Sequence, residues 1–163
     1  GRPLQIAPSR AIEQEASVII SRLKLAFPQL SMITDRLDNP KSGTHDLFFF
    51  LLKQKNAQTL TDLAFQTAQA LVFLLSNHDP ITFSELGARF FENSKVLRQG
   101  EARQLLIDWL ACCYGLGQEE EAHIWSQVHV YHDRLTVNAV IYGVVYITIM
   151  LIAGMLIFDR KEV

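Results

Sequence analysis

The chain ends in a long stretch without a single charged side chain, and this stretch limits its possible folds more than any other feature. It runs from Leu135 to Phe158, and its 24 residues would reach about 36 Å as an α-helix. Because the hydrocarbon core of a bilayer is roughly 30 Å thick, such a helix can cross it with some tilt. Charged residues stand on both sides, in segments 132–134 and 159–162. The sequence therefore predicts one transmembrane helix near the C-terminal end.

The composition of this stretch favours lipid over water. Its β-branched residues and glycines are common in membrane helices, and its polar groups are limited to Thr136, Asn138, Thr148 and two tyrosines. The alternative is the central core helix of a soluble oligomer. Such a helix is usually shorter and carries at least one charge or strongly polar group.

Small residues in the stretch predict where another helix would pack. Ala139 and Gly143 lie four residues apart, and Ala153 and Gly154 follow later. Small side chains at such spacing let two helices approach closely in lipid, and Asn138 could hydrogen-bond across the same interface. The alternative is that these residues only reflect the usual composition of membrane helices.

The flanking cations bear on orientation. Arg160 and Lys161 follow the stretch, whereas Arg134 alone directly precedes it. Because Lys and Arg are enriched on the cytoplasmic side, two against one slightly favours a cytoplasmic C-terminus. The opposite arrangement, a tail anchor with the preceding domain in the cytoplasm, also stays open.

The part of the chain before this stretch is large enough for a domain of its own. We expect residues 1–130 to form a soluble domain and residues 131–163 to form the membrane helix with a short charged tail. The whole chain has 15 Lys and Arg against 17 Asp and Glu, a formal net charge of -2. This balance gives no sign of the strongly basic face that many nucleic-acid-binding proteins carry.

Apolar residues recur at helical spacing through most of residues 1–130, and no segment shows the two-residue alternation of a strand. Pro3 and Pro8 predict an extended N-terminal arm. We expect about six helices, near residues 9–27, 44–52, 59–76, 82–91, 105–113 and 118–131. The predicted fold class is all-α: a compact multi-helix soluble domain followed by one C-terminal transmembrane helix.

Two helix starts carry local signals. Thr82 and Glu85 have the spacing of a capping box, with Ile81 and Leu86 placed as the accompanying hydrophobic pair. Thr44 is expected to cap the helix that follows the polar loop 38–43.

Two groups of side chains have more than one interpretation. The only cysteines, Cys112 and Cys113, are adjacent and therefore poorly placed to bridge each other, so we expect two free core thiols. Five phenylalanines fit either an exposed docking surface or a well-filled core: Phe48, Phe49, Phe50, Phe90 and Phe91.

The sequence shows no motif for catalysis. It lacks a glycine-rich phosphate loop, a GxSxG nucleophile turn and an HExxH zinc helix, so we predict no enzyme, catalytic residue, metal site or cofactor. His123, His129 and His132, with Asp133, could hold a metal only with ligands from elsewhere. We favour the alternative that they are interfacial residues beside a membrane.

The region from Ile81 to Leu110 could also form a helix-turn-helix, with Lys95, Arg98 and Arg103 facing nucleic-acid phosphates. Ser84-Glu85-Leu86 and residues 91–97, FENSKVL, resemble the "SxxLFxDSKxLE" stretch of Wadjet JetD-type defence proteins. Asn93 replaces the aspartate of that pattern, and no nuclease domain follows. A solvated helical hairpin is the favoured interpretation of this region.

Residues 137–163, VNAVIYGVVYITIMLIAGMLIFDRKEV, resemble the final membrane helix of ABC-2 type transporter permeases. Those chains often end in an apolar helix, a phenylalanine and a short tail of mixed charge. The resemblance implies a role in moving a substrate through a membrane complex driven by a partner ATPase. It departs from the family in the number of spans, since permeases have several and this chain has one.

The sequence thus predicts a non-enzymatic, single-pass subunit of a larger membrane protein complex, with a transporter as one such complex. Its expected partners are other membrane protein subunits and the lipid bilayer. The alternative is a soluble helical domain that binds nucleic acid or regulates another protein, with its last helix buried in an oligomer.

Overall fold

The computed structural model describes residues 8–161, without the side chains of residues 8, 9, 134–139 and 161. The chain divides into two units, Gly1–Tyr131 and His132–Val163, which we describe separately. The sequence placed this boundary at residue 130. Most of the expected N-terminal arm falls outside the described residues, and Pro8 already begins the first helix.

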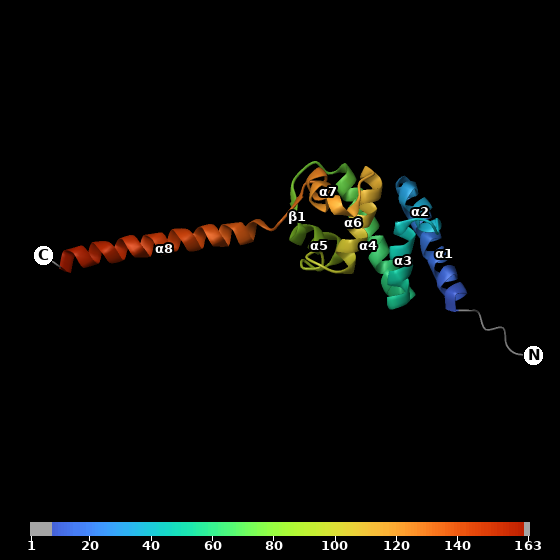
Figure 1. Ribbon diagram of the computed structural model, residues 1–163, viewed down its shortest axis with the longest axis horizontal. Helices are drawn as coiled ribbons and strands as arrows, with labels where there is room; N and C mark the ends of the chain where they lie inside the picture. Colours follow the sequence, from blue (N-terminus) through green and yellow to red (C-terminus); the bar gives the residue numbers. More distant parts are fainter. Residues whose placement is uncertain (1–7, 162–163) are drawn as a thin grey trace, which may run out of the picture. The chain divides into compact units, whose positions relative to one another are not determined.

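The first unit is built from seven α-helices among its described residues, with two short 3-10 turns and two very short strands (Figure 1). In chain order the elements are α1 Pro8–Ala26, η1 Pro28–Leu30, α2 Ser31–Asp38, α3 Gly43–Gln54, α4 Ala57–Ser76, β1 Ile81–Thr82, α5 Phe83–Phe91, α6 Glu101–Tyr114, η2 Gln118–Glu120, α7 Glu121–Gln127 and β2 Val130–Tyr131.

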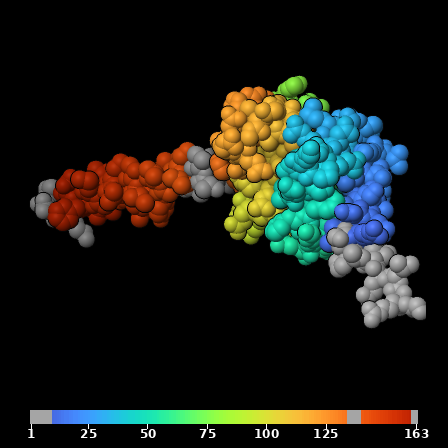
Figure 2. All heavy atoms as spheres, turned by 45° about the vertical axis from the view of Figure 1, so that its right-hand side comes forward, coloured from blue at the N-terminus to red at the C-terminus, as the bar shows by residue number. Residues whose placement is uncertain are grey.

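Helices α4 and α6 form the centre of this unit. Helix α4 packs against α1, α5 and α6, while α6 also contacts α2, α3 and α7. Figure 2 shows one face, where atoms of α1–α3 and of α6–α7 lie against one another. Leu60 and Leu71 of α4 and Trp109 of α6 are almost completely buried. Their burial gives the unit a continuous apolar core.

One helix of this unit was not expected from the sequence. Helix α2 buries Ile33, Thr34 and Leu37 against its neighbours. Its eight residues follow Pro28 and the 3-10 turn, and a pattern this short gives little periodicity to detect. Helix α2 therefore depends on packing against α1, α3 and α6 rather than on local propensity.

The prediction of a helix over residues 118–131 is wrong in its last part. Helix α7 ends at Gln127, and His129 adopts a left-handed backbone conformation with φ 59°. The chain then forms β2, which pairs in parallel with β1 through Ile81↔Val130 and Thr82↔Tyr131. This pairing joins segments nearly fifty residues apart, so no local pattern announces it.

The predicted cap at Thr82 is confirmed, because its side chain accepts a hydrogen bond from the Glu85 backbone N–H at 3.1 Å. The predicted cap at Thr44 is wrong. Ser42 caps α3 instead and accepts from the Thr44 backbone N–H at 3.2 Å. The Thr44 side chain is buried, and its hydroxyl contacts the sulfur of Cys112 in α6.

The phenylalanines serve mainly as core residues. Phe48 and Phe91 are buried, Phe49 and Phe90 are partly buried against the core, and Phe50 is 54% exposed. The interpretation of all five as an exposed docking surface is therefore wrong. Both cysteines are free, as expected, with Cys112 buried and Cys113 half-buried.

The second unit contains helix α8, Arg134–Lys161, which is 28 residues long. Its segment Val140–Arg160 is the one helical segment among the described residues that is long and apolar enough to cross a membrane. The predicted fold class is confirmed: an all-α chain with a multi-helix unit and one such C-terminal helix.

Candidate functional site

Helix α8 presents apolar side chains in every direction. From Val140 to Phe158 its large apolar residues are between 49% and 75% exposed, and none of its most apolar segment is buried. A helix on a globular surface normally has an apolar stripe and a polar face. Helix α8 has no such polar face over this length, so its side chains differ from those of an ordinary surface helix.

Three of the five predicted packing residues lie on the described part of α8. Gly143, Ala153 and Gly154 are exposed, and a Cβ added at either glycine would meet no atom within 4 Å. The side chains of Asn138 and Ala139 lie outside the described residues.

The glycine at 154 leaves a hollow in the side of the helix. This hollow has a volume of about 390 Å³, and the side chains around it include those of Met150, Leu151 and Phe158. A neighbouring helix can approach most closely at such a place.

The hydroxyl groups of α8 differ in their hydrogen bonding. Thr148 donates to the backbone oxygen of Val144 at 2.8 Å, so its hydroxyl is satisfied within the helix. The hydroxyls of Tyr142 and Tyr146 make no hydrogen bond to any residue that the structure describes, and these side chains are 75% and 66% exposed.

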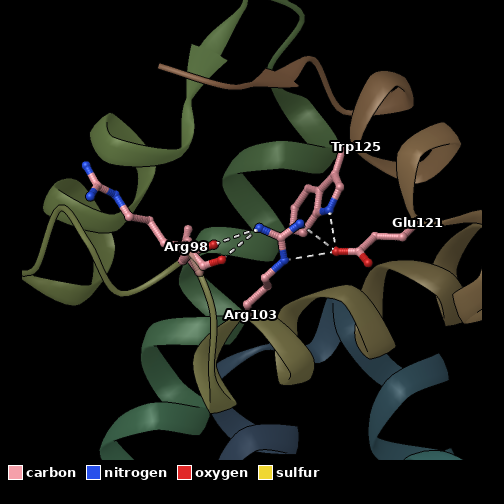
Figure 3. A network of polar contacts seen from close by, with 5 residues as sticks. Arg98, Arg103, Glu121 and Trp125 are labelled. Atoms are coloured by element: carbon pink, nitrogen blue, oxygen red, sulfur yellow. Dashed lines mark hydrogen bonds and ion pairs between the residues drawn. The ribbon is translucent and has the colours of Figure 1, made fainter. Parts of the chain in front are cut away.

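In the first unit, the end of the domain is held by a network around Arg103 (Figure 3). The Arg103 guanidinium binds one oxygen of Glu121, with Nε at 2.9 Å and Nη2 at 2.8 Å. The indole N–H of Trp125 donates to the same oxygen at 3.0 Å. The hydrogen bond from Trp125, together with Arg103, lowers the pKa of Glu121 below its ordinary value.

The same guanidinium holds the segment between α5 and α6. It donates to the backbone oxygens of Leu97 at 3.1 Å and Arg98 at 3.3 Å, and it lies over the rings of Phe83 and Trp125. These contacts occupy Arg103 inside the unit. Of the three cations considered for a nucleic-acid contact, Arg103 is therefore not available to bind phosphates.

A second polar group lies between α2, α3 and α6. The sulfur of Cys112 is 3.0 Å from the Thr44 hydroxyl and 3.5 Å from an Arg36 guanidinium nitrogen. One turn earlier, Asp108 is buried and accepts a hydrogen bond from Gln118 at 3.0 Å. Burial raises the pKa of Asp108. The contacts of Cys112 with Arg36 and Thr44 join α2 and α3 to α6.

The thiol next to this group is kept protonated. Burial is the main reason that the pKa of Cys113 rises to about 11. A thiol with this pKa is a poor nucleophile at neutral pH, because the thiolate is the reactive form.

The histidines near the end of the first unit make no metal site within the described part of the chain. No group of three or more His, Cys, Asp or Glu side chains there is placed to hold an ion. The ring of His123 instead lies 3.4 Å from the side-chain amide of Gln127.

No protein-family model, curated protein or solved structure matches this chain. The resemblances to ABC-2 permeases and to JetD-type proteins therefore stay predictions from the sequence. Among the described features, α8 is the one whose physical properties point most directly to a cellular role.

Proposed function

We propose that this chain is a non-enzymatic, single-pass subunit of a membrane protein complex. Helix α8 crosses the bilayer, and the multi-helix unit docks partner proteins at the membrane. The observation that carries the proposal is the uncharged surface of α8 over Val140–Phe158, where every described side chain is exposed.

The energetic argument concerns what surrounds α8. Leaving one large apolar side chain in water rather than in an apolar environment costs roughly 1.5–3 kcal/mol. Helix α8 exposes 15 such residues between Val140 and Phe158. Lipid removes this cost over the whole circumference, and the uncharged stretch is long enough to span the hydrocarbon core.

The sequence of α8 and its flanks also bears on the partner proteins and on the orientation of the helix in the membrane. The ABC-2-like residues 137–163 make transporter assemblies the first class in which to seek partners. The two cations Arg160 and Lys161, against Arg134, place the C-terminus on the cytoplasmic side in our proposal.

Membrane insertion is tested by extracting cell membranes that contain the full chain. The chain should resist carbonate and dissolve in detergent. Replacing Ile147 and Leu151 by arginine puts two charges at the centre of the span, each costing about 3 kcal/mol, and should release the chain into the soluble fraction. Recovery of the unaltered chain without detergent would contradict insertion.

The matched control places the same charges on the first unit. Val18 and Leu25 of α1 are apolar and exposed, at 59% and 86%. The variant with arginine at both positions should stay in the membrane fraction. Release of this control to the same extent would mean that added charge, rather than its position in α8, removes the chain from the membrane.

The subunit role is tested separately, by affinity purification of the full chain in mild detergent. Other integral membrane proteins should co-purify in fixed proportion. A chain that inserts into membranes but purifies without any other protein would contradict this part of the proposal.

A further inference from the structure

The chain between the first unit and α8 is very short. Strand β2 ends at Tyr131 and α8 begins at Arg134, so only two residues join them. Leu135, the first residue of the uncharged stretch, comes four residues after Tyr131, so their Cα atoms are at most about 14 Å apart. This limit holds however the two units are turned, because the chain connection alone sets it.

With α8 in a bilayer, as proposed above, the end of β2 lies close to the lipid headgroups. The uncharged stretch spans the hydrocarbon core, and the headgroup layer on each side of this core is about 5–8 Å deep. Strand β2 is fixed to the first unit by its pairing with β1 and by its contacts with α7. The surface of the unit around this strand pair is therefore the part held closest to the membrane.

Histidines gather around the same strand pair. The chain has five, and three of them lie within three residues of β1 or β2: His78, His129 and His132. The strand pairing brings them near one another, because the backbone N–H of Ile81, three residues after His78, donates to the backbone oxygen of His129 at 2.9 Å. His78 and His132 are exposed, and His129 is half-buried. Tyr131, 47% exposed, adds an aromatic side chain of the kind enriched at membrane–water interfaces.

The charge of this surface changes sign when its histidines are protonated. Histidine is the side chain that normally gains a positive charge between about pH 8 and pH 5. The fixed charges next to the strands are those of Asp79, Asp133 and Arg134, a net charge of -1. Three protonated histidines bring this charge to +2.

The elements around the strand pair do not alter this change of sign. Their charged or titratable side chains, on α5, η2 and α7, are Glu85, Arg89, Glu119, Glu120, Glu121 and His123. Glu85 and Arg89 of α5 have opposite charges, and the Glu121 carboxylate is bound to Arg103. With the two acidic residues of η2 included, the net charge of the region is -3, and four protonated histidines bring it to +1.

We propose that the surface around β1 and β2, with His78, His129, Tyr131 and His132, binds anionic phospholipid headgroups when its histidines are protonated. At neutral pH an anionic membrane repels the negative charge of this surface, and only the chain connection holds the unit near the lipid. In acid, both ring nitrogens of each histidine can donate to headgroup phosphates. One cationic side chain near an anionic surface strengthens binding about fivefold, and three act together here.

The test uses the full chain reconstituted into vesicles whose headgroups carry a dansyl acceptor. Both tryptophans, Trp109 and Trp125, lie in the first unit, so energy transfer from them reports how close this unit lies to the lipid surface. In vesicles with phosphatidylserine, lowering the pH from about 7.5 to about 5.5 should raise the transfer. High salt should reverse this rise because it screens the charges. In vesicles of phosphatidylcholine alone, the transfer should not change with pH.

A triple variant removes the three charges: His78→Asn, His129→Asn and His132→Asn. Asparagine tolerates the left-handed backbone of His129, which has φ 59°. This variant should lose the rise in transfer that acid causes with phosphatidylserine. His45→Asn is the control, because it removes a histidine of α3 that stacks on Phe49 within the first unit, and it should keep the rise.

The lipid-binding surface is contradicted by any of three results. They are a transfer at pH 5.5 that does not depend on phosphatidylserine, a triple variant that keeps the rise, and a rise that requires another membrane protein. Carbonate extraction of the same vesicles tests insertion separately. An inserted chain without the rise contradicts this surface alone, whereas a chain that carbonate extracts contradicts the membrane span.

Discussion

Arg103 and Glu121 are joined twice through a single carboxylate oxygen, which lies 2.9 Å from Nε and 2.8 Å from Nη2 of the guanidinium. The same arginine also binds the backbone oxygens of Leu97 and Arg98. One side chain of α6 thereby holds α7 and the segment between α5 and α6. We expect the C-terminal part of the first unit to depend on this pair.

Replacing Glu121 by glutamine should destabilise the first unit by about 1 kcal/mol at pH 7. This is below the usual range for hydrogen bonds to a charged group, because the Glu121 side chain is 40% exposed and solvent screens its charge. Urea unfolding of the full chain in mild detergent measures the effect. Both tryptophans, Trp109 and Trp125, lie in the first unit, so their fluorescence reports its unfolding.

The stability lost on Glu121→Gln should become smaller as the pH falls. The pKa of Glu121 is lower in the folded state, so its charged form favours folding above the ordinary carboxyl pKa, and this contribution disappears as the pH falls through the folded value. The difference in unfolding free energy between the unaltered chain and Glu121→Gln should therefore disappear at acid pH. As a control, Glu119→Gln changes an exposed neighbour and should leave the stability at pH 7 unchanged. A constant gap for Glu121→Gln would contradict the role of its charge.

Local patterns predict the long helices well and the non-local contacts poorly. Helix α4, Ala57–Ser76, agrees within two residues with the predicted range 59–76, because twenty residues of helical spacing leave little ambiguity. The pairing of Ile81 with Val130 has no such signal. It depends on how the whole unit folds, and it ends the predicted helix over 118–131 early.

In the candidate site, too, the sequence predicts some features, and others are seen only in the structure. The uncharged stretch of α8 is visible in the sequence because only the absence of charge is needed to find it. The sequence also shows the hydroxyl groups of this stretch, but that Thr148 bonds to the Val144 backbone oxygen is seen only in the helix. Arg103 looks like a phosphate ligand in the sequence, since its real partner Glu121 lies 18 residues away.

Asp108→Asn should make the first unit more stable at pH 7, by about 1 kcal/mol, the scale of one net hydrogen bond. Burial raises the pKa of Asp108, so the neutral side chain suits this position, and the asparagine oxygen can still accept from Gln118. The raised pKa means that the unaltered chain loses stability as the pH rises from the ordinary aspartate value to the folded value.

The advantage of Asp108→Asn should therefore grow over that pH window and then stay constant. Unfolding free energies measured between pH 4 and pH 7 check this. As a control, Asp79→Asn changes an exposed aspartate and should leave the free energy of unfolding at pH 7 unchanged. A destabilised Asp108→Asn variant at pH 7 would show that the charged carboxylate is favoured after all.

Cys113 should react slowly with iodoacetamide while the first unit is folded. Its pKa of about 11 lies two units above the ordinary value of 9.0, so at pH 8 the thiolate fraction is about 100-fold lower than in the unfolded chain. Mass spectrometry of peptides after timed labelling, with and without urea, measures the ratio. Equal rates in the two conditions would contradict the burial of this thiol.

Gly87→Ala should destabilise the first unit by about 1–3 kcal/mol, because α5 and the following segment leave no space for a side chain. A Cβ at Gly87 would lie 2.5 Å from the Asn93 backbone oxygen and 3.3 Å from Val96 Cγ1. The chain turns back here through Glu92, which has φ 55°, and the Asn93 N–H bonds to the Gly87 oxygen. Relief of the clash would have to move backbone and break this bond.

The control for this substitution is Gly43→Ala. Gly43 begins α3, and a Cβ there would meet no atom within 4 Å. Alanine is the better helix former, so this variant should be unchanged or up to about 0.5 kcal/mol more stable. Both variants are compared by urea unfolding with tryptophan fluorescence. If both variants were equally stable, the segment 92–100 would not pack against α5 as described. The hydrogen bonds from Arg103 to that segment would then be in doubt as well.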